Sequence, residues 1–196
     1  MNLIGKRCLE LQSLLTDFVD NASNSISEVS HVIAGTFKSG NKILICGNGG
    51  SAADSQHLAA EFVNSFSKDL KRPGLPAISI ATDVAVITAI SNDTNYEQIF
   101  VRQVEALGNV NDILIVLSTS GSSINCVRAL QTARDLGLKT ITFTQVGATA
   151  SRFADFSVEV PSENTQHIQA CHVFAYHTVV ELVEQILYRG EEVNSK

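Results

Sequence analysis

Residue types that mark unusual classes of protein are scarce in this sequence. Among 196 residues there are 3 prolines, 12 glycines and no tryptophan, whereas 44% of the residues are hydrophobic. That balance excludes a disordered or collagen-like chain and predicts one compact domain over residues 1–196. Within it, we expect only residues 190–196 to form a weakly ordered tail.

Long apolar runs are missing as well. No stretch approaches the roughly 18 to 20 consecutive apolar residues that a membrane-spanning helix needs. The first residues, which include Lys6, Arg7 and Glu10, lack the apolar core of a signal peptide. We therefore expect a cytoplasmic protein that does not enter a membrane.

Charged side chains are also few, at 17% of the residues, and acidic ones dominate. Lys and Arg number 14 against 20 Asp and Glu, which gives a formal net charge of -6. Such a chain offers no general attraction for nucleic acid or an anionic membrane, so a phosphate ligand would need a local site. The shortage of charge also indicates that part of the surface is buried between subunits.

The apolar spacing predicts an α/β protein. From residue 3 to residue 37 the apolar positions recur every three or four residues, which predicts two helices forming an amino-terminal helical hairpin. Short apolar runs then alternate with helical spacing, as parallel β-α-β units require. The predicted strands are residues 43–46, 77–80, 113–117, 141–143 and 156–160, and the predicted helices are residues 52–66, 84–90, 97–107, 123–136 and 166–188. The expected fold is a three-layer sandwich around a five-stranded parallel sheet.

A glycine-rich turn follows the first predicted strand and opens a helix. Residues 46–54 read Cys-Gly-Asn-Gly-Gly-Ser-Ala-Ala-Asp, and the free backbone N–H groups of such a turn favour an anion or sugar oxygens. Gly47, Gly49 and Ala52 also satisfy a relaxed dinucleotide fingerprint. A NAD-dependent oxidoreductase is thus an alternative, but its acidic residue is missing at the expected distance, because Asp83 comes about thirty positions later. A tight turn without any ligand is the plain structural alternative.

A second loop of this kind follows the third predicted strand. Residues 118–123 read Ser-Thr-Ser-Gly-Ser-Ser and place five hydroxyl groups around one glycine, just before a helix. One or two of these serines could serve as ordinary helix caps, but hardly all of them. Two ligand loops at the carboxyl ends of parallel strands lie where open α/β sheets bind their ligands. We interpret this one as a phosphate cradle without a basic residue.

Metal-ligating side chains gather on two of the predicted helices. His57 and Glu61 are four residues apart and share one helix face. On the last helix, Gln169, His172 and His177 fall within nine positions, and spacing alone leaves the two histidines equal candidates. Two His, a Glu and an amide oxygen suit Zn²⁺ or a similar divalent ion, although Gln is an unusual ligand.

Taken in order, these motifs cover nearly the whole chain and resemble the phosphoheptose isomerases of the sugar isomerase (SIS) domain family. The matching positions are residues 46–51, His57, Glu61, Ser91-Asn92-Asp93, residues 118–123, Gln169 and His177. The serine-rich loop alone indicates only a SIS domain, whereas the set of His57, Glu61, Gln169 and His177 is specific to the isomerases. The resemblance therefore favours His177 over His172. It implies a flavodoxin-like, Rossmann-like sheet and a homotetramer with active sites at subunit contacts, residues 1–38 serving in the assembly.

The resemblance also implies an activity and a site. The activity is the conversion of sedoheptulose 7-phosphate to D-glycero-D-manno-heptose 7-phosphate, the first step toward the heptose of the lipopolysaccharide core. One zinc ion per subunit would be held by His57, Glu61, Gln169 and His177. The substrate would contact Asn48, Gly49, Gly50, Ser51, Glu61, Asn92, Asp93, Ser118, Thr119, Ser120, Ser123 and Gln169.

The residues agree with this chemistry. An aldose-ketose isomerisation through an enediol needs one group to remove a proton and one to return it, and Glu61 and His177 are the natural pair. A group bound to a metal is a poorer base, so either the ligation loosens with substrate or the ion is partly structural.

Two positions depart from the family pattern. Ser65 stands where family members often carry an arginine, and Gln166 stands where they often carry an acidic residue. We expect Lys68, Lys71, Arg72 or a residue of another subunit to replace the missing cation. The main alternative function is that of a non-catalytic SIS protein that binds the replication initiator DnaA. In that branch the isomerase Glu and second His are replaced, whereas this chain keeps Glu61 and His177.

Overall fold

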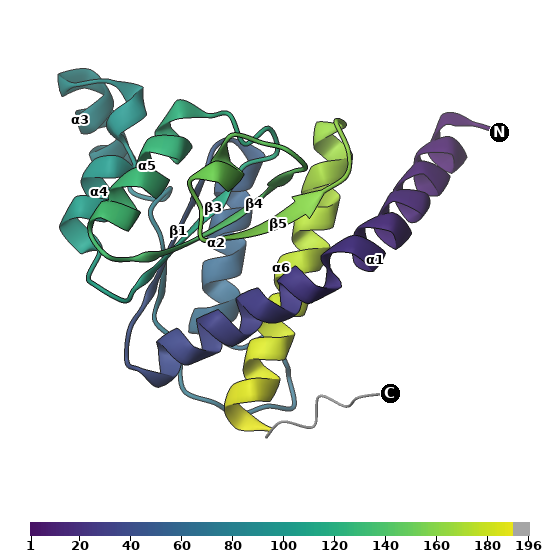
Figure 1. Ribbon diagram of the computed structural model, residues 1–196, viewed down its shortest axis with the longest axis horizontal. Coiled ribbons are helices and arrows are strands. Elements are labelled where there is room, and N and C mark those ends of the chain that lie inside the picture. The colour runs from purple at the N-terminus through teal and green to yellow at the C-terminus, as the bar shows by residue number, and fades with distance from the viewer. Residues whose placement is uncertain (190–196) are drawn as a thin grey trace.

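Five parallel strands form the centre of the molecule. The computed structural model describes residues 1–189, and the predicted tail at residues 190–196 lies outside them. The sheet has the order β2-β1-β3-β4-β5 (Figure 1). Its strands are β1 (Ile43–Gly47), β2 (Ala77–Ser79), β3 (Ile113–Leu117), β4 (Lys139–Gln145) and β5 (Phe156–Val160). The prediction of a five-stranded parallel sheet is confirmed.

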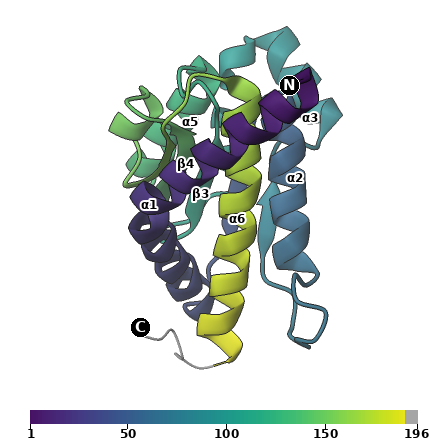
Figure 2. The ribbon, with the colours of Figure 1, turned by 90° about the vertical axis from the view of Figure 1, so that its right-hand side faces the viewer.

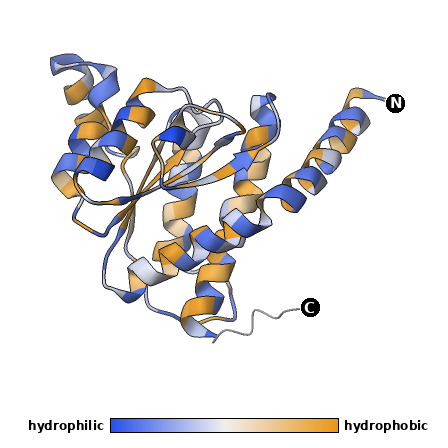
Figure 3. Cartoon of the chain, in the orientation of Figure 1, coloured by the Kyte–Doolittle hydropathy of each residue, from blue (hydrophilic) through white to orange (hydrophobic). Residues whose placement is uncertain are grey.

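Helices cover both faces of this sheet, as predicted. One face packs against α1 (Leu3–Lys38), α2 (Gly50–Val63) and α6 (Thr165–Tyr188), and the other against α4 (Val101–Leu107) and α5 (Ile124–Asp135). Strands β1 and β3 are buried at every position, because their apolar side chains feed both cores. Figure 3 shows this apolar centre in orange. A shorter helix, α3 (Val84–Asp93), and a single 3-10 turn, Tyr96–Gln98, lie between β2 and α4.

The amino-terminal segment differs from the prediction. It is one continuous helix of 36 residues, so the expected helical hairpin is wrong. No glycine or proline interrupts the chain between Gly5 and Gly35, and the polar stretch at residues 20–25 stays helical because Ala22 and Ile26 continue the buried face of the helix. The polar side chains of this stretch bond carbonyls of the preceding turn. For example, Asn21 Nδ2 donates to the carbonyl of Asp17 at 2.7 Å, and Ser25 Oγ donates to that of Ala22 at 2.9 Å.

The first turns of α1 project away from the body of the molecule (Figures 1 and 2). Leu3, Ile4 and Leu9 are 68%, 79% and 54% exposed, whereas Phe18 and Ile26, farther along the helix, are buried in the core. The helix therefore carries an apolar surface that this chain does not cover.

The strand order places both ligand loops together. The chain leaves β1 for α2 on one face of the sheet and leaves β3 for α5 on the other, while β1 and β3 are neighbours. A crevice opens at such a topological switch point, at the carboxyl ends of the strands. Within residues 1–189, no helix has the length and hydropathy that crossing a membrane requires.

Candidate active site

Three of the predicted zinc ligands meet where α2 packs against α6. His57 and Glu61 lie one turn apart on α2, and His177 lies on α6, the helix beside α2 in Figure 2. His57 Nε2 is 3.0 Å from Glu61 Oε1 and 3.4 Å from His177 Nε2, and donor atoms of all three residues lie within 4.8 Å of one another. Tetrahedral zinc ligands at about 2.0 to 2.1 Å from the ion are about 3.4 Å apart, so this donor set fits zinc. We call these three residues the His-Glu-His cluster.

The electrostatics of this cluster favour a neutral His177. Partial burial lowers the pKa of His177, and the charge of His57 lowers it further, while Glu61 opposes both effects. A neutral imidazole is the form that can bind a metal or accept a proton.

Asp54, one turn before His57, belongs to the same site. Burial raises the pKa of Asp54, against the hydrogen bond from Gln169 and the charge of His57. Gln169 Nε2 donates to Asp54 Oδ2 at 2.8 Å, and the Gln169 amide lies over Gly50, where an added Cβ would come within 2.5 Å of that nitrogen. Gln169 thereby joins α6 to the first turns of α2, next to the glycine-rich loop.

The geometry separates the two histidines that spacing left open. His172 is fully buried, its ring edge toward Phe143, and neither of its ring nitrogens has a hydrogen-bond partner in the described part of the chain. Burial lowers its pKa to about 4, so His172 is neutral near pH 7. It faces the sheet, whereas His177 joins the His-Glu-His cluster.

A buried ion pair connects the carboxyl-terminal ends of α2 and α6. Arg72 Nε donates to Glu184 Oε1 at 2.7 Å, and both side chains are at most 1% exposed. Arg72 also donates to the carbonyls of Glu61 and Phe62 at the end of α2, each at 2.8 Å. The suggestion that Arg72 replaces a cation at the ligand is therefore wrong, because its guanidinium is committed to this structural contact.

The glycine-rich loop has the backbone that its sequence predicts. Gly49 has φ +56°, a conformation that glycine adopts without steric cost, and it begins α2. Asn48 is held by a reciprocal amide pair: its Nδ2 donates to Asn125 Oδ1 at 3.0 Å, and Asn125 Nδ2 donates back at 2.9 Å. Tyr96 adds a third contact, donating from its hydroxyl to Asn48 Oδ1 at 3.0 Å. Asn125 lies on α5, so this pair ties the first loop to the helix that follows the second.

The serine-rich loop turns at Gly121, which has φ +57°. A Cβ there would collide with Thr144 and Ala148, so only glycine fits. Ser118 Oγ accepts from the Gly121 N–H at 3.1 Å, whereas Ser120 and Ser122 are exposed and bond each other at 3.1 Å. Ser123 precedes α5, yet within residues 1–189 its hydroxyl makes no capping hydrogen bond. The plain helix-cap explanation therefore does not account for it.

The remaining predicted substrate contacts occupy different positions. Thr119 lies on the serine-rich loop, and Ser51 is buried in the first turn of α2. Asn92 and Asp93 are exposed at the end of α3, where Asn92 Nδ2 donates to Asp93 Oδ1 at 2.9 Å. No contact joins these two residues to the His-Glu-His cluster in the described residues.

Comparison with known proteins identifies the family. The chain matches the SIS domain family over residues 8–145. It is 51% identical to a phosphoheptose isomerase of Thermodesulfovibrio yellowstonii over 164 residues, which span 83% of this chain and 81% of the relative. The chain belongs to the phosphoheptose isomerase family of SIS domain proteins.

Solved structures of this family share the fold. A phosphoheptose isomerase from Francisella tularensis superposes with a TM-score of 0.86 at 34% identity, covering 94% of this chain and 100% of that one. One from Neisseria gonorrhoeae gives a TM-score of 0.87 at 29% identity, over 93% and 97% of the two chains. The predicted family is confirmed, and with it the fold.

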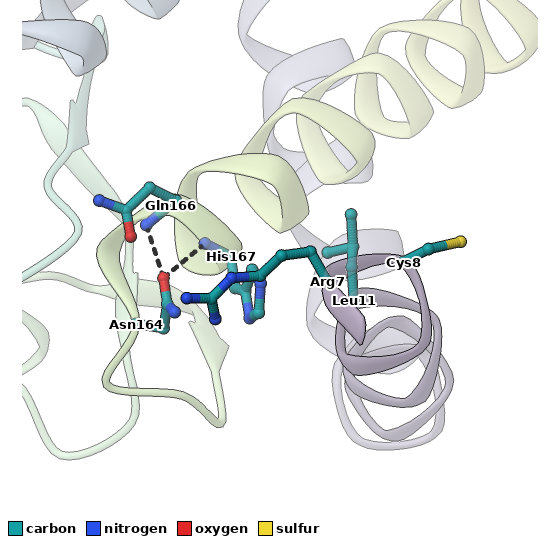
Figure 4. A pocket seen from close by; sticks show the side chains of 6 residues that line it. All are labelled: Arg7, Cys8, Leu11, Asn164, Gln166 and His167. Atoms are coloured by element: carbon teal, nitrogen blue, oxygen red, sulfur yellow. Dashed lines mark hydrogen bonds between the residues drawn. The ribbon is translucent and has the colours of Figure 1, made fainter. Parts of the chain in front are cut away.

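A cavity outside the His-Glu-His cluster lies between α1 and the start of α6. It has a volume of about 570 Å³ and is lined by Arg7, Cys8, Leu11, Asn164, Gln166 and His167 (Figure 4). Asn164 accepts from the backbone N–H groups of Gln166 and His167, so its side chain caps α6. Gln166, one of the two departures from the family pattern, thus lines this cavity at the projecting helix.

Three residues that contact predicted site residues were not predicted from the sequence: Asp54, Asn125 and Tyr176. Asp54 could have been found, because it lies three positions before His57 and seven before Glu61 on one helix face. Asn125 and Tyr176 carried no such signal. Asn125 meets Asn48 only through the fold, and Tyr176 belongs to the apolar stripe of α6, although its hydroxyl lies 3.0 Å from His57 Nδ1.

Proposed function

We propose that this chain is a phosphoheptose isomerase, an aldose-ketose isomerase that converts sedoheptulose 7-phosphate to D-glycero-D-manno-heptose 7-phosphate for lipopolysaccharide core synthesis in the cytoplasm. The observation that carries the proposal is the His-Glu-His cluster, a general base and two imidazoles at the helix pair beside two ligand loops. Its relatives bear the same name at up to 51% identity.

The surroundings of this cluster connect it to both loops. Asp54, one turn before His57, accepts a hydrogen bond from Gln169, and the Gln169 amide lies over Gly50 beside the glycine-rich turn. From that loop, Asn48 leads to Asn125, two positions after Ser123. A sugar phosphate held by the serine-rich loop would therefore extend along the glycine-rich loop toward His57 and Glu61.

The proton transfer falls to Glu61 and His177. Isomerisation through an enediol removes a proton from the carbon beside the ketose carbonyl and delivers one to the neighbouring carbon. Glu61 removes the carbon-bound proton and delivers it to the neighbouring carbon, and His177, neutral at its lowered pKa, moves the hydroxyl proton between the two oxygens. His57 and Gln169 position the site.

Zinc would be bound by His57, Glu61, His177 and Gln169. Because the Gln169 amide nitrogen donates to Asp54, its oxygen Oε1 would be the atom that binds the ion. Zinc bound there would supply a Lewis acid for the substrate carbonyl.

Phosphate and sugar contacts follow from the two loops. Ser118, Thr119, Ser120 and Ser123 would hold the phosphate by hydroxyl and backbone donors, because no basic side chain belongs to that loop. Asn48, Gly49, Gly50 and Ser51 would contact the sugar hydroxyls, with Asn92 and Asp93 reaching the substrate from α3.

Assembly into a homotetramer follows from the apolar surface that the chain leaves open. Leu3, Ile4 and Leu9 are exposed on α1, and Phe174 is 41% exposed on α6. Surfaces of this kind mark contacts between subunits. Light scattering at micromolar concentration should give a tetrameric mass, and a monomeric mass would contradict this part of the proposal.

Incubation of the purified, zinc-supplied chain with sedoheptulose 7-phosphate tests the activity directly. We expect an aldose heptose 7-phosphate to accumulate until equilibrium, and the Glu61→Gln variant to form it far more slowly. Absence of any aldose from a folded wild-type chain would overturn the proposal. No observation favours the DnaA-binding alternative.

A further inference from the structure

Tyr176 lies against the ring of His57 from the side opposite to Glu61. It is fully buried on α6, and its hydroxyl oxygen is 3.0 Å from His57 Nδ1. The two rings meet edge to face, with centroids 5.6 Å apart and planes at 75°. Both ring nitrogens of His57 therefore have a partner: Nδ1 faces Tyr176, and Nε2 faces Glu61 and His177.

The positions of the protons follow from the chemistry of these partners. An ionised carboxylate accepts hydrogen bonds only, so in the metal-free site Nε2 of His57 carries a proton and donates it to Glu61. In a neutral ring Nδ1 is then an acceptor, and the Tyr176 hydroxyl donates to it.

A metal bound at Nε2 would reverse these roles. With Nε2 as a ligand, the ring proton would be on Nδ1, which would then donate its hydrogen bond. A hydroxyl both donates and accepts, so Tyr176 can bond Nδ1 in either tautomer. A carbonyl or an ammonium group in its place would favour only one of them.

We propose that Tyr176 is the positioning residue of His57, and that its hydroxyl holds the imidazole through Nδ1 in both tautomers, so that the ring proton can pass from Nε2 to Nδ1 and leave Nε2 to a metal ion without a turn of the ring. That His57 binds a metal ion rests on the proposed function. That the Tyr176 hydroxyl holds the His57 ring does not, because it concerns only the contact between these two residues.

The substitution Tyr176→Phe removes the hydroxyl and keeps the buried ring. Its matched control is Tyr188→Phe on the same helix, because within residues 1–189 the Tyr188 hydroxyl makes no hydrogen bond. Both variants should bind sedoheptulose 7-phosphate through unchanged loops. Zinc affinity, measured by competition with a chromophoric chelator, should fall about 10- to 100-fold in Tyr176→Phe and stay unchanged in Tyr188→Phe.

A second measurement needs no metal. In the ¹⁵N-histidine spectrum of the metal-free chain, the Nδ1 resonance of His57, assigned by its loss in His57→Gln, should shift in Tyr176→Phe and not in Tyr188→Phe. Zinc affinity within twofold of the wild type, or an unmoved Nδ1 resonance, would overturn the inference. A wild-type chain that binds no zinc would instead contradict the proposed function, and the Nδ1 resonance would still decide whether Tyr176 holds His57.

Discussion

The His-Glu-His cluster and the serine-rich loop are built in different ways. The cluster consists of side chains on two long helices whose ends are fixed by the buried Arg72–Glu184 pair, and its members already bond one another. In the loop, Ser120 and Ser122 are exposed and hydrogen-bond only to each other. The loop turns at Gly121, where any side chain would collide with Thr144 and Ala148. This contrast indicates that the helices supply the chemistry and the loop supplies binding. Substitutions should therefore separate kcat from KM.

The largest effect should come from the scaffold of the cluster. Arg72→Ala leaves the Glu184 carboxylate buried without its partner, which typically costs about 3 to 5 kcal/mol of unfolding free energy. Urea unfolding of the variant and the wild type measures this loss of unfolding free energy. The matched control is Arg102→Ala, because Arg102 pairs with Glu105 on the surface and such pairs contribute only about 0 to 1 kcal/mol. Equal losses in the two variants would mean that the buried pair does not anchor the helices.

Loss of a metal ligand should be the next largest effect. His57→Ala should weaken zinc binding by about 10²-fold or more, since even residues that only support a ligand typically give 10- to 100-fold. Activity should fall with the metal content and recover in part when excess Zn²⁺ is added. His172→Asn offers a comparison on α6 outside the cluster, with zinc affinity as its readout. An unchanged zinc content in His57→Ala would remove His57 from the ligand set.

A smaller effect is expected at the serine-rich loop. Ser120→Ala removes one hydroxyl donor to the phosphate, a charge-assisted bond that is typically lost at about 1.5 to 3 kcal/mol. Steady-state kinetics should show KM raised by about tenfold or more, with kcat changed much less. Ser23→Ala on the exposed part of α1 should leave both constants unchanged. If KM in Ser120→Ala were that of the wild type, this loop would not be the phosphate cradle.

The smallest effect concerns acid stability. Burial alone would raise the pKa of Glu184, but the hydrogen bonds from Arg72 and from the Phe66 and Ser67 N–H groups outweigh it and lower that pKa from 4.5. A carboxyl whose pKa is lower when folded stabilises the protein above its unfolded pKa and loses that contribution as the pH falls through its folded pKa. Wild-type stability should therefore decline below about pH 4.5, and a Glu184→Gln variant should show a shallower decline over that range. Identical pH profiles would contradict this assignment.

The sheet was predictable because its strands are short apolar runs bounded by turns, and such runs need no long-range information. The first helix was not, because the polar stretch at residues 20–25 resembles a turn. Phe18, Ala22, Ile26 and Val29 nevertheless continue one buried stripe through that stretch. Burial of the stripe favours a continuous helix over a local break.

Only part of the site was within reach of sequence reasoning. Helix geometry alone brings His57 next to Glu61, four residues later. The choice between His172 and His177 depends on which face of α6 meets the sheet, and the residue pattern of a helix that is apolar over most of its surface does not settle that. Contacts between distant segments, such as Tyr176 with His57, depend on the packing of α2 against α6 and had no sequence signal.

The turnover number of Glu61→Gln with sedoheptulose 7-phosphate tests the central claim most directly. The amide keeps the shape of the side chain and removes the base, so kcat should fall by about 10²-fold or more. The oligomeric mass and the thermal stability should stay those of the wild type, and zinc content measured alongside separates a lost base from a lost ligand. Near-normal kcat in this variant would contradict the assignment of proton transfer to the His-Glu-His cluster, even if the fold and the substrate were right.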